Sequence, residues 1–383
     1  MKFNKITHAL LVLAALSATA ASGQAVGVTD KEVRIGEVVP LTGAVSFAGE
    51  AHFLGSKLAA AGANDSGGVG GRKVVVVTED DGYVPARAFQ AAQKLVTSDK
   101  VFAITGTSGT SHTNAMMPML IENNVPTIVS INPNEQSYTP PKKQMFVLGV
   151  DYATGTYELT KGIAQRLGKK GGKYVVIYQD DDYGANIRQG YRRVVKDLGL
   201  DSVAEVEYKR GQRDFAAEML KIAALKPDVI ISENVAIMRE ARKLGLPATI
   251  GTVWTAHLPV VQNLAGEAGE GYITVDYTAT PSDASAKDFM ALARKHLSPD
   301  EIKKLNRYSM TAYAGMTLMV QAMRLCEKTL TRDCVISQLE SGKGFDVGPF
   351  MDKISFTADR RLSGAKLRFF RSDAKAADFV PID

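Results

Sequence analysis

The chain has 383 residues, too many for one ordinary hydrophobic core and enough for two α/β domains of typical size. Apolar residues make up 45% and charged residues 23%, which is the balance of a globular protein and excludes a disordered or fibrous one. The formal net charge is +5, and the charges of both signs are interspersed along the chain. We therefore expect no nucleic-acid partner.

The first 25 residues have the pattern of a secretory signal peptide. Two lysines precede an apolar run at 9–16, and small residues follow up to position 25. We expect cleavage after Ala25, with Ala20 or Ala21 as alternatives and a buried N-terminal helix as the competing interpretation. The apolar run is too short to anchor the chain in a bilayer, and no cysteine follows it to accept a lipid. The sequence predicts a periplasmic protein that is not lipid-anchored.

The next part of the chain alternates β-rich runs with stretches of helical periodicity. The run at 73–78 is almost entirely valine, as in a sheet that is buried on both faces. Alternation of this kind predicts a parallel, doubly wound sheet. We expect strands at 33–39, 73–78, 101–105 and 126–130, and helices at 53–64, 86–97 and 113–123.

A second series of the same kind begins near residue 150. Two such series indicate two lobes of similar architecture. Strands are expected at 174–178, 203–208, 228–232 and 249–253, and helices at 156–167, 185–198, 215–225 and 236–244. Further helices are expected at 284–296, 309–326 and 332–339, and the segments 354–356 and 366–370 are expected to form a terminal hairpin.

The chain contains two cysteines, Cys326 and Cys334. In an oxidising compartment, a lone pair eight residues apart favours a disulfide between the end of one helix and the start of the next. Free thiols are the alternative. Neither a Cys-x-x-Cys spacing nor paired histidines occur, so we expect no metal site and no cofactor.

Four segments resemble the periplasmic substrate-binding proteins of ABC transporters, specifically the branched-chain amino acid (Leu/Ile/Val)-binding type. Their order and spacing match over nearly the whole chain after residue 30. The segments are 33–43 with Gly49, 64–73 with Asp80 and Asp81, 178–184, and 342–350 with 354–356.

The resemblance implies an α/β fold of two Rossmann-like lobes with parallel sheets, joined by a three-crossing hinge (periplasmic binding protein type I). Lobe 1 would comprise 31–148 plus 277–345, and lobe 2 would comprise 149–276 plus 346–383. Ligands of open α/β sheets lie beyond the carboxyl ends of the strands, so the ligand is expected between the lobes. A monomer that delivers its ligand to permease subunits in the inner membrane is expected.

The loop at 105–113 is the strongest candidate for ligand binding. It is rich in hydroxyl side chains, follows an expected strand and opens an expected helix, so it can hold an anion without a cationic side chain. The resemblance assigns the ligand's carboxylate to Thr110 or Ser111, with ordinary helix capping as the alternative. It also assigns ligand contacts to Asn132 and Asn134, for which a simple turn is the alternative.

Other candidates come from both lobes. Tyr183 matches an aromatic ligand-binding position, with core packing as the alternative, and Ser46 and Phe47 follow the first strand. Amino-acid binders of this type keep an acidic residue near the position of Trp254, which could instead stack on an aromatic or bulky apolar ligand. Either Glu233 replaces that acid, or the ligand has no amine.

Enzymatic interpretations are weaker. The sequence Gly-Thr-Ser-Gly-Thr at 106–110 lacks the last glycine of a nucleophile elbow. The glycines at 67–71 precede a strand, whereas a nucleotide-binding loop follows one. The sequence therefore predicts a non-enzymatic receptor for a small carboxylate: a branched-chain or related amino acid, or an aromatic or other organic acid. A periplasmic sensor subunit of a signalling system is the alternative, because fold alone does not separate it from a transport protein.

Overall fold

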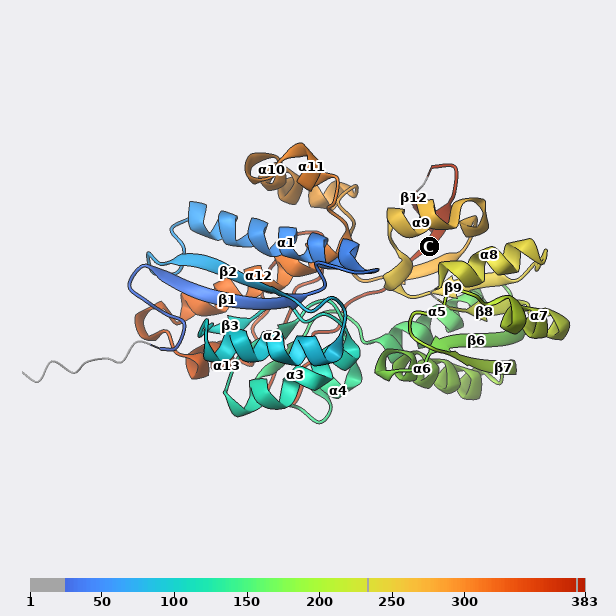
Figure 1. Cartoon of the computed structure of the whole chain (residues 1–383), viewed down its shortest axis with the longest axis horizontal. Helices are drawn as coiled ribbons and strands as arrows, with labels where there is room; N and C mark the ends of the chain where they lie inside the picture. The colour runs from blue at the N-terminus through green and yellow to red at the C-terminus, as the bar shows by residue number, and fades with distance from the viewer. Residues whose placement is uncertain (1–24, 233, 377, 383) are drawn as a thin grey trace, which may run out of the picture.

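The computed structural model describes residues 25–232, 234–376 and 378–382. The predicted signal peptide lies outside the described residues, except for Ala25. Figure 1 shows two lobes side by side, each built around a sheet with helices on its faces. The predicted fold class is confirmed, because both lobes are layered α/β units dominated by parallel strands.

The first lobe contains a parallel sheet with the strand order β2-β1-β3-β4-β5. Its strands are β1 (Glu32–Val39), β2 (Lys73–Asp80), β3 (Ala103–Ile104), β4 (Thr127–Val129) and β5 (Met145–Val147). Its helices are α1 (Ser46–Asp65), α2 (Pro85–Thr97), α3 (Thr110–Glu122), α4 (Glu135–Tyr138), α10 (Lys287–His296), α11 (Pro299–Ile302), α12 (Arg307–Leu325) and α13 (Arg332–Leu339). The last four belong to a later part of the chain that returns to this lobe (Figure 1).

The second lobe contains a sheet with the order β12-β11-β10-β9-β8-β6-β7. Its strands are β6 (Lys173–Gln179), β7 (Asp201–Tyr208), β8 (Val229–Ile231), β9 (Thr249–Thr252), β10 (Ile273–Asp276), β11 (Arg368–Asp373) and β12 (Asp378–Pro381). Its α-helices are α5 (Tyr152–Arg166), α6 (Asp182–Leu198), α7 (Ala216–Leu225), α8 (Val235–Lys243) and α9 (Pro259–Ala265). The strands β11 and β12 are antiparallel to their neighbours, whereas the others are parallel.

Close packing of α1 on α12 ties the returning segment to the first lobe. Gly55 of α1 lies so near the other helix that an added Cβ would stand 2.1 Å from the carbonyl oxygen of Ser309. Glycine is therefore needed at this position because the two helix backbones approach each other directly. A disulfide between Cys326 and Cys334, with Cα atoms 6.0 Å apart, joins the end of α12 to α13.

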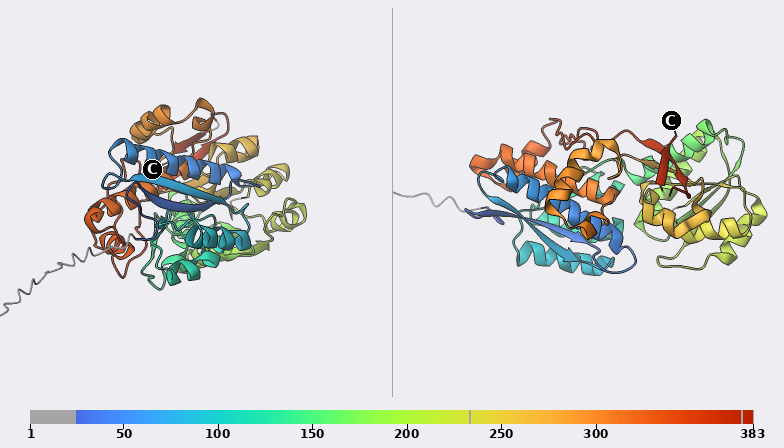
Figure 2. Two further views of the ribbon diagram at one scale, coloured as in Figure 1. Left: turned by 60° about the vertical axis from the view of Figure 1, so that its left-hand side comes forward. Right: turned by 90° about the horizontal axis from the view of Figure 1, so that it is seen from above.

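The chain passes between the lobes three times, and the third passage comes later than the sequence suggested. Residues 346–363 had been expected in the second lobe, yet Phe345 pairs with Ile354, and Leu362 pairs with Val147 of β5. The predicted hairpin of 354–356 with 366–370 is also wrong, because β11 pairs with β12. This segment has little regular structure of its own, so its place depends on the first lobe's surface. Figure 2 shows the chain reaching the red hairpin on the second lobe.

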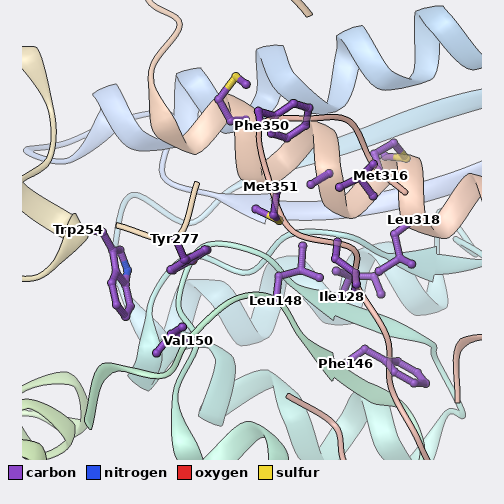
Figure 3. Close-up of a cluster of buried hydrophobic side chains, with 14 of the residues drawn as sticks. Ile128, Phe146, Leu148, Val150, Trp254, Tyr277, Met316, Leu318, Phe350 and Met351 are labelled. Carbon is purple, nitrogen blue, oxygen red and sulfur yellow. The ribbon is translucent and has the colours of Figure 1, made fainter. Parts of the chain in front are cut away.

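The hydrophobic core runs from the first lobe into the hinge. Figure 3 shows Tyr277 and Val150, on two of the passages, between Trp254 of the second lobe and Leu148 and Ile128 of the first. All five side chains are buried. Packing of this kind holds the hinge segments in defined positions, because interiors are close-packed and tolerate little displacement.

A buried ion pair joins the lobes beside this core. Asp276 ends β10 in the second lobe, and Arg307 begins α12 in the first; neither side chain is exposed. Arg307 Nε and Nη2 donate to the two carboxylate oxygens at 2.7 and 3.0 Å, and His257 Nδ1 lies 2.8 Å from the same carboxylate. Burial opposes ionisation of Asp276, but the charge of Arg307 and the contact with His257 outweigh it and lower the pKa to about 2.

Among the described residues, no helix is long and apolar enough to cross a membrane.

We predict that Asp276→Asn lowers the free energy of unfolding by about 3–5 kcal/mol, because it leaves the Arg307 guanidinium buried without a counter-charge. Urea unfolding at neutral pH measures this loss. Asp300→Asn, which removes an exposed partner of Lys303, is the matched control and should cost less than about 0.5 kcal/mol. Equal losses in the two variants would contradict a structural role for the buried pair.

The same pair predicts a pH dependence. Because the pKa of Asp276 is lowered in the folded state, its stabilising contribution is present above the unfolded value near 4 and is lost as pH falls toward 2. Between pH 5 and 2.5 the unmodified protein should lose about 2 kcal/mol more stability than Asp276→Asn. Parallel losses in urea titrations of the two proteins at both pH values would refute this assignment.

Candidate functional site

A cavity of about 430 Å³ lies between the lobes, within the range of small-molecule sites. It is formed mainly by loops and helix starts at the carboxyl ends of the strands. The first lobe lines it with Pro40, Ala44, Val45, Phe47, Ala48, Tyr83, Ser108, Gly109, Thr110, Ile131, Asn132 and Tyr308. The second lobe lines it with Tyr152, Gln179, Tyr183, Tyr208, Asn234, Val235, Thr255, Val261 and Leu264. No Asp, Glu, Lys, Arg or His side chain occurs among these described lining residues.

The start of α3 forms a buried polar part of the wall. Ser108, Gly109 and Thr110 are all buried and line the cavity. Gly109 is the N-cap of α3, and no side chain caps the helix there. Among the described residues, the buried Thr110 Oγ1 has no hydrogen-bond partner. A helix N-terminus with free N–H groups and an unpaired hydroxyl is suited to an anionic group.

A network of side-chain hydrogen bonds fixes this loop. Asn132 Nδ2 donates to the carbonyl oxygen of Thr107 at 2.6 Å, and Thr113 Oγ1 donates to Asn132 Oδ1 at 2.8 Å. Asn132 lines the cavity, but these bonds already engage its side-chain amide within the protein. Asn134 Oδ1 accepts from Ser137 N at 3.1 Å and caps α4, away from the cavity lining.

Tyr83 reaches the cavity from the loop after β2. Its backbone has a positive φ of 60°, and its N–H donates to Asp81 Oδ1 at 2.9 Å. Asp80 Oδ1 accepts from the N–H groups of Leu41 and Gly82, both at 2.8 Å, so one carboxylate joins the loops after β1 and β2. These bonds hold a backbone conformation that a tyrosine otherwise rarely adopts.

Tyr152 forms much of the second lobe's wall together with Tyr183. The Tyr152 ring stacks on Trp254 with centroids 5.3 Å apart and meets the Tyr183 ring edge-on at 4.7 Å. The hydroxyl of Tyr183 lies 3.2 Å from Thr255 Oγ1. Gly155 lies so close to the indole that an added Cβ would be 2.5 Å from it, so α5 covers Trp254 tightly.

Burial raises the pKa of three tyrosine hydroxyls of the site. It raises the pKa of Tyr83 to about 12 despite the nearby charge of Arg210. Burial likewise raises the pKa of Tyr152 and of Tyr308 above the ordinary value. These side chains therefore offer the ligand polar hydroxyls and ring faces without a charge.

Polar contacts join the lobes near the cavity. Arg210 of the second lobe pairs with Asp181, approaches Ser111 Oγ of the first lobe at 3.4 Å and places its guanidinium 5.2 Å from the centroid of the Tyr83 ring. Asn114 Nδ2 of α3 donates to Asp182 Oδ2 of α6 at 3.0 Å. These contacts fix the relation of the two walls in this structure.

The structure brings together only part of the predicted site. Phe47, Thr110, Asn132 and Tyr183 line the cavity, whereas Ser46, Ser111 and Asn134 do not, and Glu233 lies outside the described residues. Of the two candidates for carboxylate binding, Thr110 lines the cavity, whereas Ser111 does not and its side chain contacts Arg210.

Trp254 does not form the stacking surface that was expected at the edge of the cleft. Its side chain is 0% exposed and is absent from the cavity lining. It packs instead between Tyr152 and Tyr277. The strand-end position is typical of a cleft residue, but the Trp254 ring packs in the hinge core, and the buried Tyr152 lines the cavity in its place.

Sequence reasoning missed most of the tyrosines. Tyr83 follows β2, Tyr152 follows a hinge passage and Tyr208 is the last residue of β7, so a search for aromatic residues at strand ends and hinge passages would have found them. Tyr308 gives no such signal, because it lies in the first turn of α12 and follows no strand. No group of three or more His, Cys, Asp or Glu side chains that could hold a metal ion occurs in the described parts of the chain.

Comparisons with known proteins agree with this architecture. A family model described as periplasmic binding protein matches residues 32–377. An amino acid binding protein of Pseudomonas aeruginosa is 30% identical over 223 residues, covering 57% of this chain and 59% of that relative, so the match spans less than two thirds of its length.

Two solved structures have the same fold over nearly the whole chain. A fatty acid ABC transporter substrate-binding protein from Thermomonospora curvata superposes with a TM-score of 0.83 at 23% identity, covering 94% of this chain and 93% of that one. A solute-binding protein of an ABC transporter from R. palustris, in complex with 4-hydroxybenzoate, has a TM-score of 0.80 at 18% identity and covers 92% and 96%.

We predict that Thr110→Val leaves the free energy of unfolding of the ligand-free protein unchanged or raises it by about 1 kcal/mol, because the lost hydroxyl has no described partner. Thr113→Val is the matched control. It removes the donor to Asn132 and should cost about 1–2 kcal/mol in urea unfolding. A comparable loss in Thr110→Val would show that this hydroxyl is already used within the protein.

Proposed function

The chain belongs to the periplasmic binding protein family, and from that premise we propose that its interlobe cavity captures a small monocarboxylate without an amine for uptake by an ABC transporter. The observation that carries this proposal is the uncharged cavity lining, which combines a helix N-terminus with tyrosine and aliphatic side chains. The named relatives bind chemically different solutes, so the fold does not choose the ligand.

The carboxylate is assigned to the start of α3. Thr110 supplies a buried hydroxyl with no described partner, and the first N–H groups of α3 have no side-chain cap. Hydrogen bonds from neutral donors to a carboxylate are charge-assisted and stronger than those between neutral groups. Because a buried anion needs such compensation, this is the part of the described lining best suited to the ligand's charge.

The absence of an amine follows from the charge of the wall. A buried ammonium group needs an anionic partner, and its removal from water is otherwise costly. The described lining offers neutral oxygens from Asn, Gln, Thr and Tyr, but no carboxylate. Glu233, the one acidic candidate from the sequence, lies outside the described residues, so its variant belongs in the test.

A receptor role fits the arrangement of the lobes. The ligand would contact both walls and so stabilise the form in which the lobes are joined over one in which they are separated. Only the joined form presents both lobes to a permease in a fixed relative position. We propose that the chain acts as a non-enzymatic, periplasmic monomer in this role, with permease subunits of the inner membrane as its partners.

The test uses two pairs of ligands that differ only in the α-amine: 4-methylpentanoate with leucine, and 3-phenylpropionate with phenylalanine. Isothermal titration of protein freed of bound solute by unfolding and refolding should show binding of each amine-free acid about 100-fold tighter than its amino acid, since an unpaired buried charge costs about 3 kcal/mol or more. Tighter binding of the amino acids would overturn the proposal. If the Glu233→Gln variant then lost this tighter binding, the ammonium group would be assigned to Glu233.

Thr110→Val should weaken binding of the preferred acid by about 10- to 100-fold, because a hydrogen bond to a charged group is worth about 1.5–3 kcal/mol. Thr105→Val is the matched control: its buried hydroxyl is also without a described partner in the same loop, but it does not line the cavity. Unchanged affinity in Thr110→Val, measured by the same titration, would place the carboxylate elsewhere.

A further inference from the structure

The cavity lining contains a buried polar group and a separate, half-exposed apolar group. The buried polar group is formed by Ser108, Gly109 and Thr110 at the start of α3 together with Asn132. The exposed and half-buried lining residues include an aliphatic and aromatic group: Ala44, Val45 and Phe47 from the first lobe, and Val235 and Leu264 from the second. Tyr83, Tyr183 and the polar Gln179, Asn234 and Thr255 make up the rest of these half-buried positions. The side chain of Leu264 is 51% exposed although it lines the cavity.

Apolar contact continues across the lobes in this apolar group. Phe47 and Val235 pack against one hydrophobic cluster that contains Ile131 and Tyr308 of the first lobe and Val261 of the second. Asn306 Nδ2 donates to the carbonyl oxygen of Phe47 at 3.3 Å, so the cap of α12 holds the first-lobe side of this group. The apolar surface is therefore built by both lobes and is continuous with the cavity.

The half-exposed apolar group in the lining suits the apolar part of a ligand. Polar residues usually surround the mouth of a site. Covering a half-exposed apolar side chain with another apolar group removes its surface from water and is favourable. The geometry points to a ligand whose apolar tail runs outward from the buried head and lies between Val45 and Phe47 on one side and Val235 and Leu264 on the other. We name these four residues the apolar mouth.

We infer that this protein prefers monocarboxylates with an extended alkyl or arylalkyl tail over compact ones, because the apolar mouth takes the tail. This inference rests on the proposed function, since it uses the assignment of the carboxylate to the start of α3. It adds the length of the ligand and the residues that select it. A compact acid would occupy the buried polar part of the lining and leave the apolar mouth in water.

The test is a titration series with straight-chain acids from butanoate through hexanoate to octanoate, measured calorimetrically on the purified protein. Each added methylene that is partly buried should tighten binding about threefold, so octanoate should bind on the order of 80-fold tighter than butanoate. An affinity that stays level or falls beyond hexanoate would overturn the inference.

The Leu264→Ser variant tests whether Leu264 selects the length of the ligand. The readout is the dissociation constant of butanoate divided by that of octanoate, because a general loss of affinity changes both constants equally and leaves the ratio unchanged. The ratio should fall at least threefold in Leu264→Ser. Leu220→Ser is the matched control, since Leu220 is 60% exposed on α7 of the same lobe and does not line the cavity. An equal ratio in both variants would contradict the inference; Val45→Ser, from the opposite lobe, repeats the test.

The outcomes separate the two proposals. If butanoate and hexanoate bind and octanoate does not, the proposed function stands and the length preference is wrong. If none of the acids binds, the proposed function fails and the length preference fails with it.

Discussion

The ion pair between Arg307 and Asp276 joins the lobes where water does not reach, and the position of the cavity wall depends on it. Arg307 opens α12, so the bond that anchors the helix start to the end of β10 also sets the direction of Tyr308, the next residue, which lines the cavity. A buried pair of this kind adds little net stability over apolar packing, but it is directional. We interpret it as the contact that fixes the register of the hinge against the site.

The cleft keeps its charges outside the lining. Arg210 and Asp181 pair with each other near the Tyr83 ring, and Asp80 is committed to backbone N–H groups of two loops. The described lining therefore offers neutral hydroxyls, amides and tyrosine faces, and burial raises the pKa of Tyr83, Tyr152 and Tyr308 among them. In the proposed function, oriented dipoles at the start of α3 would recognise the ligand's anion, and shape and apolar contact would recognise the remainder of the ligand. The physical basis of both proposals is this separation of charge from the ligand.

The alternation of buried strands and amphipathic helices was enough to predict the two-lobed α/β fold, because periodicity is a local property of the sequence. The loop at 105–113 could be predicted for the same reason. The position of residues 346–363 could not, since an irregular segment is placed by the surface it packs on. Trp254 and Tyr308 show why the site could be predicted only in part. The ring of Trp254 packs in the hinge core although it follows a strand end, and Tyr308 lines the cavity although its helix follows no strand.

The most direct measurement is a crystal structure of the protein with 4-methylpentanoate in the cavity. We predict that a carboxylate oxygen lies within hydrogen-bond distance, about 3 Å, of Thr110 Oγ1 and of a backbone N–H in the first turn of α3, with the methyl groups directed toward Leu264. A carboxylate bound to Arg210, or a ligand with its methyl groups against Thr110, would contradict it.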